Sequence, residues 1–270
     1  MEKYVFKDGF EASYIASRQN PRVVSASKLA DKKYREKSGL FLCEGVKLTL
    51  EAAAYGSLAE VYIRESDAEK HTDAVSSAVN AGGDLYVVSD AAFDKITTEK
   101  APQGIISVAR MRENGSDDEG GKMTLLLDCI RDPGNLGTVL RSACALGGAQ
   151  VVLHSCADLY NPKTVRAAMG AIFKTDVSIV SDAAEYVRTQ RNAGRRVLAA
   201  ALKSDSLYLG SYEVRSNDVI VIGNEGHGVS GDVIEACSDT VLIPMEENTE
   251  SLNASVAASV ILWEYARAGK

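Results

Sequence analysis

Three short stretches of the sequence combine turn residues with polar side chains that could take part in chemistry. They are DPGNLG at 132–137, GNEGHGVSG at 223–231 and IPMEENTESLNAS at 243–255. Each follows an apolar run typical of a strand, and ligands of open α/β sheets bind beyond the carboxyl ends of the strands. These stretches are therefore the candidate functional site.

The first two stretches differ in the groups that they offer. The first turns into a helix with Asn135 at its start and Arg141 near its middle. In the second, glycines 223, 226 and 228 let backbone amides approach a ligand closely, and Glu225 adds a carboxylate. A plain glycine-rich turn with a surface glutamate, before a helix capped by Ser230, would also explain the second stretch.

The third stretch leads into an apolar helix expected over 251–267. Ser251 and Asn253 fall in its first turn, where side-chain oxygens meet free backbone amides. Capping alone would explain Ser251, but it explains the whole SLNAS cluster less easily. Along the helix, Leu252, Val256, Val260 and Trp263 recur near helical spacing and can bury one face.

Familiar motifs of other enzyme classes do not occur in the sequence. It contains no GxGxxG, no GxxxxGK[ST] and no GxSxG, so dinucleotide, P-loop and hydrolase-elbow sites lack their signatures. The three histidines, at 71, 154 and 227, lack metal-ligand spacing, and the five cysteines form no CxxC pair. We therefore expect no metal site, reduced thiols and structural or solvated histidines.

Length, composition and charge describe an ordinary globular protein of two domains. The chain has 270 residues, of which 46% are hydrophobic, and a formal net charge of −7. No apolar run reaches membrane-spanning length and no secretory signal precedes the first domain, so we expect no membrane association and a cytoplasmic location. The acidic total argues against a nucleic-acid partner, but residues 18–37 carry seven basic residues against two acidic ones. That segment is either a solvated helix face or an RNA contact.

Strand-like and helical runs alternate through two segments, which predicts an α/β fold with a linker between two domains. We expect an N-terminal extension at 1–17, an α/β domain at 18–111, a polar, glycine-rich linker at 112–121 and a larger domain at 122–270. In the larger domain the strands are continuously apolar, as in VIVIG, which is typical of a parallel sheet covered on both faces. Its strands are expected at 123–130, 150–154, 176–180, 196–202, 218–223 and 240–243, and its helices at 135–147, 162–171, 183–194, 231–237 and 251–267.

In this order, the three stretches resemble the three signature motifs of the SpoU (TrmH-type) RNA 2′-O-ribose methyltransferases of the SPOUT superfamily. The motifs read DPGNLGTVLRSACALG, VIVIGNEGHGVS and IPMEENTESLNASVAAS, and the resemblance covers 122–270. LYNPKTVRAAMGAIFKTDV resembles the segment that links the first two motifs, with Asn161 where serine is common. NPRVVSASKLADKKYREKSGLFLCEGVKLTLEAAAYG resembles the family's ribosomal-protein-like RNA-binding domain.

The resemblance implies a fold that hydrophobic periodicity does not predict. The SPOUT domain is a parallel-sheet domain whose C-terminal chain forms a deep trefoil knot, although knots are rare among proteins in general. The family binds S-adenosylmethionine in the knot and works as a homodimer, with the C-terminal helix usually at the interface. The small residues and apolar stripe of 251–267 fit that use.

The resemblance also assigns roles to residues of the three motifs. The catalytic positions correspond to Asn135, Arg141, Glu225, Ser251 and Asn253. The positions for S-adenosylmethionine correspond to Gly223, Asn224, Gly226, Ile243, Met245 and Leu252. Arg141 has been given the role of base in this family. Binding a phosphate and stabilising the alkoxide are physically safer, because a guanidinium stays protonated in proteins.

The expected function is methylation of a ribose 2′-hydroxyl in RNA, with ribosomal RNA as the favoured substrate. The alternatives are a non-catalytic RNA-binding relative, the same reaction on transfer RNA, and a nicotinamide-dependent oxidoreductase, which lacks its motif. With an RNA-binding domain implied, we expect the basic segment to contact RNA phosphates. The contacting residues would include Arg18, Arg22, Lys28, Lys32, Lys33 and Arg35.

Overall fold

The computed structural model describes residues 2–112, 121–203, 205–224, 226–246 and 251–268. The chain forms two compact units. The first contains residues 1–112 and 160–173, and the second contains 113–159 and 174–270. Among the helices within the described ranges, none combines the length and apolarity that a membrane span requires.

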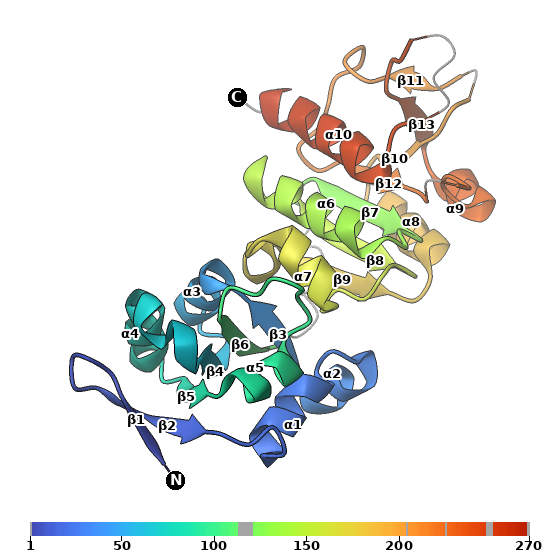
Figure 1. Cartoon of the computed structure of the whole chain (residues 1–270). Helices are drawn as coiled ribbons and strands as arrows, with labels where there is room; N and C mark the ends of the chain where they lie inside the picture. Colours follow the sequence, from blue (N-terminus) through green and yellow to red (C-terminus); the bar gives the residue numbers. More distant parts are fainter. Residues whose placement is uncertain (1, 113–120, 204, 225, 247–250, 269–270) are drawn as a thin grey trace. The chain divides into compact units, whose positions relative to one another are not determined.

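The first unit is built on a mixed sheet, whose strands run in the order β1-β2-β5-β4-β6-β3 (Figure 1). β2, β5 and β4 are parallel neighbours, whereas β1 pairs antiparallel with β2, and β6 pairs antiparallel with β4 and β3. The first two strands lie in the segment expected to be an extension, so the sheet begins before residue 18. The strands are β1 (Lys3–Val5), β2 (Glu11–Ile15), β3 (Leu40–Glu44), β4 (Leu58–Arg64), β5 (Asp84–Val88) and β6 (Ile105–Arg110).

Helices cover both faces of this sheet. One core is formed by α1 and α5 against the strands, with Val23, Tyr62 and Phe93 fully buried in it. α3 and α4 pack together and against β6 and β5. α7 packs on β3, where the Phe41 ring lies between those of Tyr160, at 4.7 Å, and Phe173, at 6.0 Å. The helices are α1 (Pro21–Lys28), α2 (Lys32–Ser38), α3 (Val46–Ala54), α4 (Thr72–Asn80), α5 (Asp90–Ile96) and α7 (Pro162–Ala168), with 3-10 turns η1 (Glu65–Lys70) and η2 (Ala171–Phe173).

One basic residue expected to contact RNA is instead part of this core. Arg35, on α2, is 2% exposed. Its Nη1 donates to the backbone oxygens of Leu29, at 2.7 Å, and Ala30, at 2.6 Å. Buried polar groups are generally hydrogen-bonded inside the protein because leaving them unpaired is costly, and these two carbonyls serve the Arg35 Nη1 in this way. Arg35 therefore fixes the turn between α1 and α2, and the prediction that it contacts RNA is wrong.

The second unit holds an all-parallel sheet in the order β11-β13-β10-β12-β7-β8-β9. The parallel sheet predicted from the apolar runs is confirmed. All four residues of β12 are buried, as a strand covered on both faces requires. β11 has two residues and carries no recognisable strand pattern. The strands are β7 (Thr124–Asp128), β8 (Gln150–His154), β9 (Val177–Val180), β10 (Val197–Ala200), β11 (Leu207–Tyr208), β12 (Val219–Ile222) and β13 (Asp239–Leu242).

Two pairs of helices cover the parallel sheet (Figure 1). α6 (Pro133–Ala145) packs with α10 (Ala254–Ala268), and α10 also contacts β12. α8 (Ala183–Asn192) packs with α9 (Gly231–Ala236), and together they bury apolar side chains of β10 and β12. The pairing of α6 with α10 matters for function, because it joins the first motif to the third.

Candidate active site

A cavity of about 330 Å³ opens at the carboxyl ends of β10, β12 and β13. Its volume lies at the lower end of the range for small-molecule sites. The walls are mainly apolar, with exposed backbone and a few polar groups, which suits a nucleoside-like ligand. The lining residues are Ala200, Ala201, Leu202, Ile222, Gly223, Asn224, His227, Gly228, Val229, Ile234, Val241, Leu242, Ile243, Met245, Ser251, Leu252, Ala254 and Ala257.

Most residues expected to bind the cofactor lie in this wall. Gly223 and Asn224 come from the loop after β12, and Ile243, Met245 and Leu252 from the segment after β13. Gly226 does not line the cavity, but its backbone nitrogen donates to Asn224 Oδ1 at 2.8 Å. Ser251 also lines the cavity, and Glu225 lies outside the described residues.

The loop after β12 folds back on itself tightly. Asn224 and Gly228 exchange two backbone hydrogen bonds, of 3.1 and 2.8 Å. A Cβ on Gly223 would lie 2.1 Å from the carbonyl carbon of Gly228, so residue 223 has no room for a side chain. Gly228 has a φ of +70°, a conformation that glycine adopts without strain. The glycines at 223 and 228 are therefore needed for the shape of the loop.

A hydrogen bond joins the first motif to the third. Asn253 Nδ2 donates to Asn135 Oδ1 at 3.1 Å, across 118 residues of sequence. Asn253 Oδ1 accepts the backbone N–H of Ser255 at 2.9 Å, so Asn253 caps α10. The helix begins at Ala254 rather than at 251, and the capping role considered for Ser251 belongs to Asn253. The cap and the bridge together fix the Asn135 amide.

Arg141 presents its side chain on the exposed side of α6. It makes no hydrogen bond or ion pair with any residue that the structure describes, including Asn135. Six residues separate it from Asn135, which is a rise of roughly 9 Å along the helix. The Arg141 and Asn135 side chains therefore do not contact each other.

A buried carboxylate that none of the three sequence motifs contains, that of Asp128, is bonded to the end of the loop after β12. Asp128 ends β7 and is 1% exposed. His154 Nδ1 donates to its Oδ1 at 2.8 Å, and the Ser230 hydroxyl donates to its Oδ2 at 2.7 Å. Burial acts to raise the pKa of Asp128, but the hydrogen bonds from His154, Ser230 and Cys129 outweigh it and hold that pKa below its usual value. At neutral pH Asp128 is therefore ionised.

Asp128, Cys129 and His154 could each offer an atom to one metal ion, since these atoms lie within 4.8 Å of one another. However, His154 and Ser230 already occupy the two carboxylate oxygens. Burial and the Asp128 charge raise the pKa of the Cys129 thiol, which opposes the thiolate that a metal requires. The cluster is therefore better explained as a hydrogen-bonded group.

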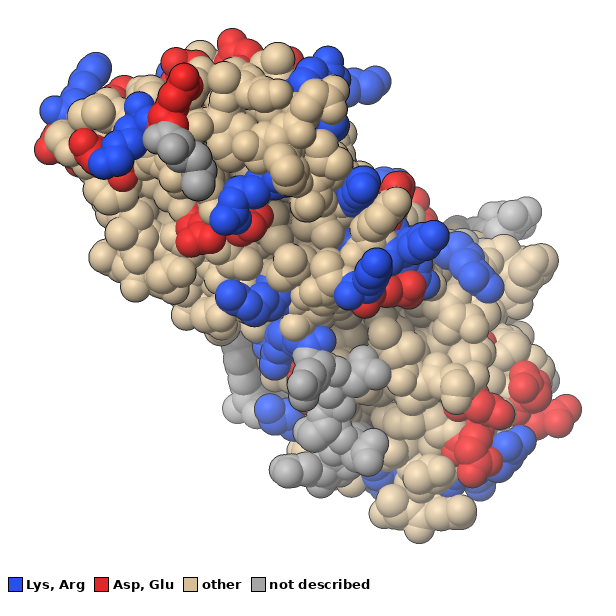
Figure 2. Space-filling view, turned by 90° about the horizontal axis from the view of Figure 1, so that it is seen from below, with Lys and Arg blue, Asp and Glu red and all other residues tan. Residues whose placement is uncertain are grey.

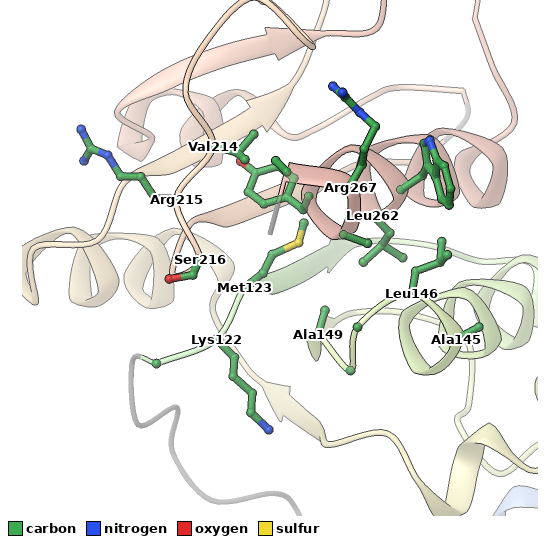
Figure 3. A pocket seen from close by; sticks show the side chains of 17 residues that line it. Lys122, Met123, Ala145, Leu146, Ala149, Val214, Arg215, Ser216, Leu262 and Arg267 are labelled. Carbon is green, nitrogen blue, oxygen red and sulfur yellow. The ribbon is translucent and has the colours of Figure 1, made fainter. Parts of the chain in front are cut away.

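A larger cavity, of about 950 Å³, lies at the amino-terminal ends of the strands, beside Met123 and the last turn of α10. It contains none of the predicted site residues. Figure 3 shows the side chains of Lys122, Arg215 and Arg267 pointing apart rather than toward one point. Since ligands of open α/β sheets bind at the carboxyl ends, we place the site in the smaller cavity.

Two family models match the chain. Residues 122–263 match the SpoU rRNA Methylase family, and residues 20–107 match the MRM3-like substrate binding domain. A similar curated protein is the 23S rRNA (guanosine(2553)-2′-O)-methyltransferase RlmP of Bacillus subtilis. It is 32% identical over 253 residues, covering 92% of this chain and 97% of the relative. The resemblance expected from the three motifs is confirmed.

Solved structures agree over most of the chain. The S-adenosylmethionine-bound rRNA methyltransferase from Sinorhizobium meliloti has a TM-score of 0.82 at 28% identity and covers 95% of this chain and 98% of its own. The SpoU methyltransferase AviRb from Streptomyces viridochromogenes, in complex with the same cofactor, has a TM-score of 0.81 at 25% identity and covers 92% and 98%. These matches favour an S-adenosylmethionine-dependent enzyme over a non-catalytic RNA binder or a nicotinamide enzyme.

Proposed function

Because the chain belongs to the SpoU rRNA methylase family, we propose that it methylates the 2′-hydroxyl of one guanosine in the large ribosomal RNA. It is an RNA 2′-O-ribose methyltransferase with S-adenosylmethionine as methyl donor, as the sequence predicts. The choice of guanosine in 23S rRNA follows the relative RlmP, which matches both units of this chain. The observation that supports the site best is that the second and third motifs line the 330 Å³ cavity, while Asn135 of the first motif accepts a hydrogen bond from Asn253 of the third.

The cavity fits S-adenosylmethionine in size and chemistry. Ile243, Leu252 and Val229 offer apolar surfaces to an adenine ring, and the loop after Gly223 brings backbone close to the cavity. Met245, Asn224 and Ser251 complete the wall that we assign to the cofactor. When bound there, S-adenosylmethionine supplies a methyl group already activated by its sulfonium.

The remaining roles fall to groups outside the cavity wall. Asn253 holds the Asn135 amide, so Asn135 can orient the ribose. Arg141, exposed and always charged, binds an RNA phosphate and stabilises the negative charge that develops on the 2′-oxygen. Ser251 and Glu225 are proposed to order this region by family correspondence. A cytoplasmic location stays a prediction.

The test is methylation of total RNA from a strain that lacks the gene, with labelled S-adenosylmethionine and mapping of the label. We expect one labelled ribose, on a guanosine.

Arg141→Ala should lower the rate by about 100-fold or more while cofactor affinity is unchanged, since loss of one oxyanion-stabilising donor typically has that effect. Arg188→Ala, which removes an exposed arginine on α8, is the matched control and should keep full activity. Full activity of Arg141→Ala would remove the residue from the mechanism, and label in transfer RNA alone would overturn the substrate.

The course of the chain in the second unit is compatible with the trefoil knot of the family. β13 lies beyond β10, on the side away from β12. The chain then returns to form α10, which packs on α6 and contacts β12. We assign the described parts of this return, 243–246 and 251–254, to the threaded segment, because residues of both parts line the cavity.

Two surfaces are proposed for binding partners. On α10, Val256, Val260 and Trp263 are exposed on one face, and we assign this face to a second copy of the chain. For RNA, we keep Arg18, Lys28, Lys32 and Lys33, which are exposed, and give less weight to Arg22, which pairs with Glu60 at 3.1 Å. Figure 2 shows Lys and Arg side chains in several separate groups on the face drawn there, some beside Asp or Glu. Local phosphate contacts need only such groups.

The domain boundaries that we propose are 18–111 for RNA binding and 122–270 for methyl transfer, with 112–121 between them, and the sheet of the first unit also takes in β1 and β2 before residue 18. The two family models begin and end close to these limits. The packing of 160–173 with the first unit adds a segment of the second domain's sequence to the first compact unit.

A further inference from the structure

The loop that follows β12 is held at both ends by one short turn after β7. At its start, Asn224 Nδ2 donates to the backbone oxygen of Cys129 at 3.1 Å. At its end, Ser230 donates to Asp128 Oδ2 from both its hydroxyl, at 2.7 Å, and its backbone nitrogen, at 3.1 Å. Residues 128 and 129 therefore receive three hydrogen bonds from the loop 224–230.

This turn is itself in an unusual conformation. Cys129 has a φ of +62°, which is uncommon for a residue with a side chain and persists only where the surroundings hold it. Its backbone nitrogen donates to the oxygen of His154 at 2.9 Å, and the His154 ring bonds Asp128. His154, at the end of β8, thus supports both residues of the turn.

Between its two anchors, the loop forms one wall of the cavity. His227, Gly228 and Val229 line it, together with Asn224. Hydrogen bonds to an ionised acceptor are stronger than neutral ones, so the Asp128 carboxylate is a firm anchor for Ser230. The loop is therefore bonded to a buried charge that does not itself line the cavity.

We propose that Asp128, oriented by His154, is a positioning residue that fixes the loop 224–230 in the shape that binds S-adenosylmethionine. This inference rests on the proposed function, since it assumes that the cavity is the cofactor site. Asp128 acts through Ser230 and the Cys129 turn, so it should control cofactor affinity more than the chemical rate.

The experiment compares Asp128→Asn and Ser230→Ala with Asp218→Asn. Asp218 is also buried in this unit and is hydrogen-bonded by Arg196 and Tyr265. It precedes β12, however, and so lies at the amino-terminal ends of the strands, away from the cavity. We expect Asp128→Asn to weaken S-adenosylmethionine binding, measured by calorimetry, by at least about 10-fold, with a smaller loss for Ser230→Ala. The KM for the cofactor should rise more than kcat falls. Asp218→Asn should lower the melting temperature and leave cofactor affinity unchanged.

Hydrogen exchange separates positioning from general destabilisation. Backbone amides of 226–230 should exchange faster in Asp128→Asn and Ser230→Ala than in the wild type, with exchange in β8 and β10 unchanged. If Asp128→Asn does not fold, Ser230→Ala alone tests the proposal, because it removes only the hydroxyl that donates to Asp128 and leaves the buried carboxylate in place. Wild-type cofactor affinity in both variants, or an equal loss in Asp218→Asn, overturns this inference alone. Wild-type protein that binds no S-adenosylmethionine overturns the proposed function as well.

Discussion

Gly223 is the residue whose size the fold constrains most directly. A Cβ there would overlap the backbone of Gly228, which cannot move aside like a flexible side chain. Gly223→Ala should therefore displace the loop, weaken S-adenosylmethionine binding by at least about 10-fold and lower the unfolding free energy by about 1–3 kcal/mol, a typical cost of overpacking. Calorimetry and thermal unfolding measure the two effects.

Gly231→Ala is the matched control for that substitution. Gly231 begins α9, a few residues further along, and a Cβ there would meet nothing within 4 Å. Its replacement by alanine should change neither cofactor binding nor stability appreciably. Equal behaviour of the two variants would show that the loop tolerates a side chain at 223.

At single positions, the sequence predicts the polar groups near the cavity better than the groups that support them. Asn135 and Asn253 stand out because they follow strands, and the strand-end rule needs no coordinates. Asp128 does not stand out, because its role depends on His154 and Ser230, which lie 26 and 102 residues away. The role of Arg35 escapes prediction for a similar reason, since the carbonyls that bind it are brought together by the turn between two helices.

The prediction that the basic segment contacts RNA now depends on the two short helices α1 and α2. Lys32 and Lys33 lie on the exposed side of α2, and Lys32 Nζ is 3.6 Å from the Glu36 carboxylate. Reversing both charges, in Lys32→Glu with Lys33→Glu, should weaken binding to ribosomal RNA. The slope of log affinity against log salt should fall by about 1 for each phosphate that the variant no longer binds. Titrations at several salt concentrations measure it.

Arg35→Met provides the contrast within the same helix. It leaves the buried carbonyl of Leu29 and the part-buried carbonyl of Ala30 without the donor that Arg35 supplies, which should cost about 1–3 kcal/mol of stability. Its salt slope should equal that of the wild type. If the lysine variant keeps the wild-type slope, α2 is a solvated face and not an RNA contact.

Regular elements of the second unit follow from the sequence because parallel strands are long apolar runs separated by helical ones. β11 escapes prediction because two residues carry no period. β1 and β2 escape it because the hairpin that they form is short and shows no apolar alternation, with only Ala12 and Ile15 buried. The strand order and the return of the chain to α10 depend on contacts across the whole unit, which periodicity does not record.

At the scale of the whole molecule, α10 has two apolar faces, one buried in its own unit and one exposed. The sequence suggests that Leu252, Val256, Val260 and Trp263 could be buried on one face, whereas in the structure Trp263 is 57% exposed, Val256 47% and Val260 36%. The residues that α10 buries against its own unit are Ala254, Ser255, Ala258, Ile261, Leu262 and Tyr265. A tryptophan beside two valines on an exposed face is typical of the centre of an interface.

Trp263→Glu should therefore convert a dimer into a monomer. Loss of a central tryptophan commonly costs about 2 kcal/mol or more, so the dissociation constant should rise by at least about 30-fold. Ile179→Glu is the control, because Ile179 is an equally exposed apolar residue on β9, away from α10. Sedimentation at micromolar concentration should show wild type and Ile179→Glu as dimers and Trp263→Glu as a monomer. A wild-type monomer, or a Trp263→Glu dimer of unchanged affinity, would mean that α10 serves another purpose. Because α10 begins at the Asn253 cap that bonds Asn135, a dimer formed through this helix would brace the catalytic rim of each copy.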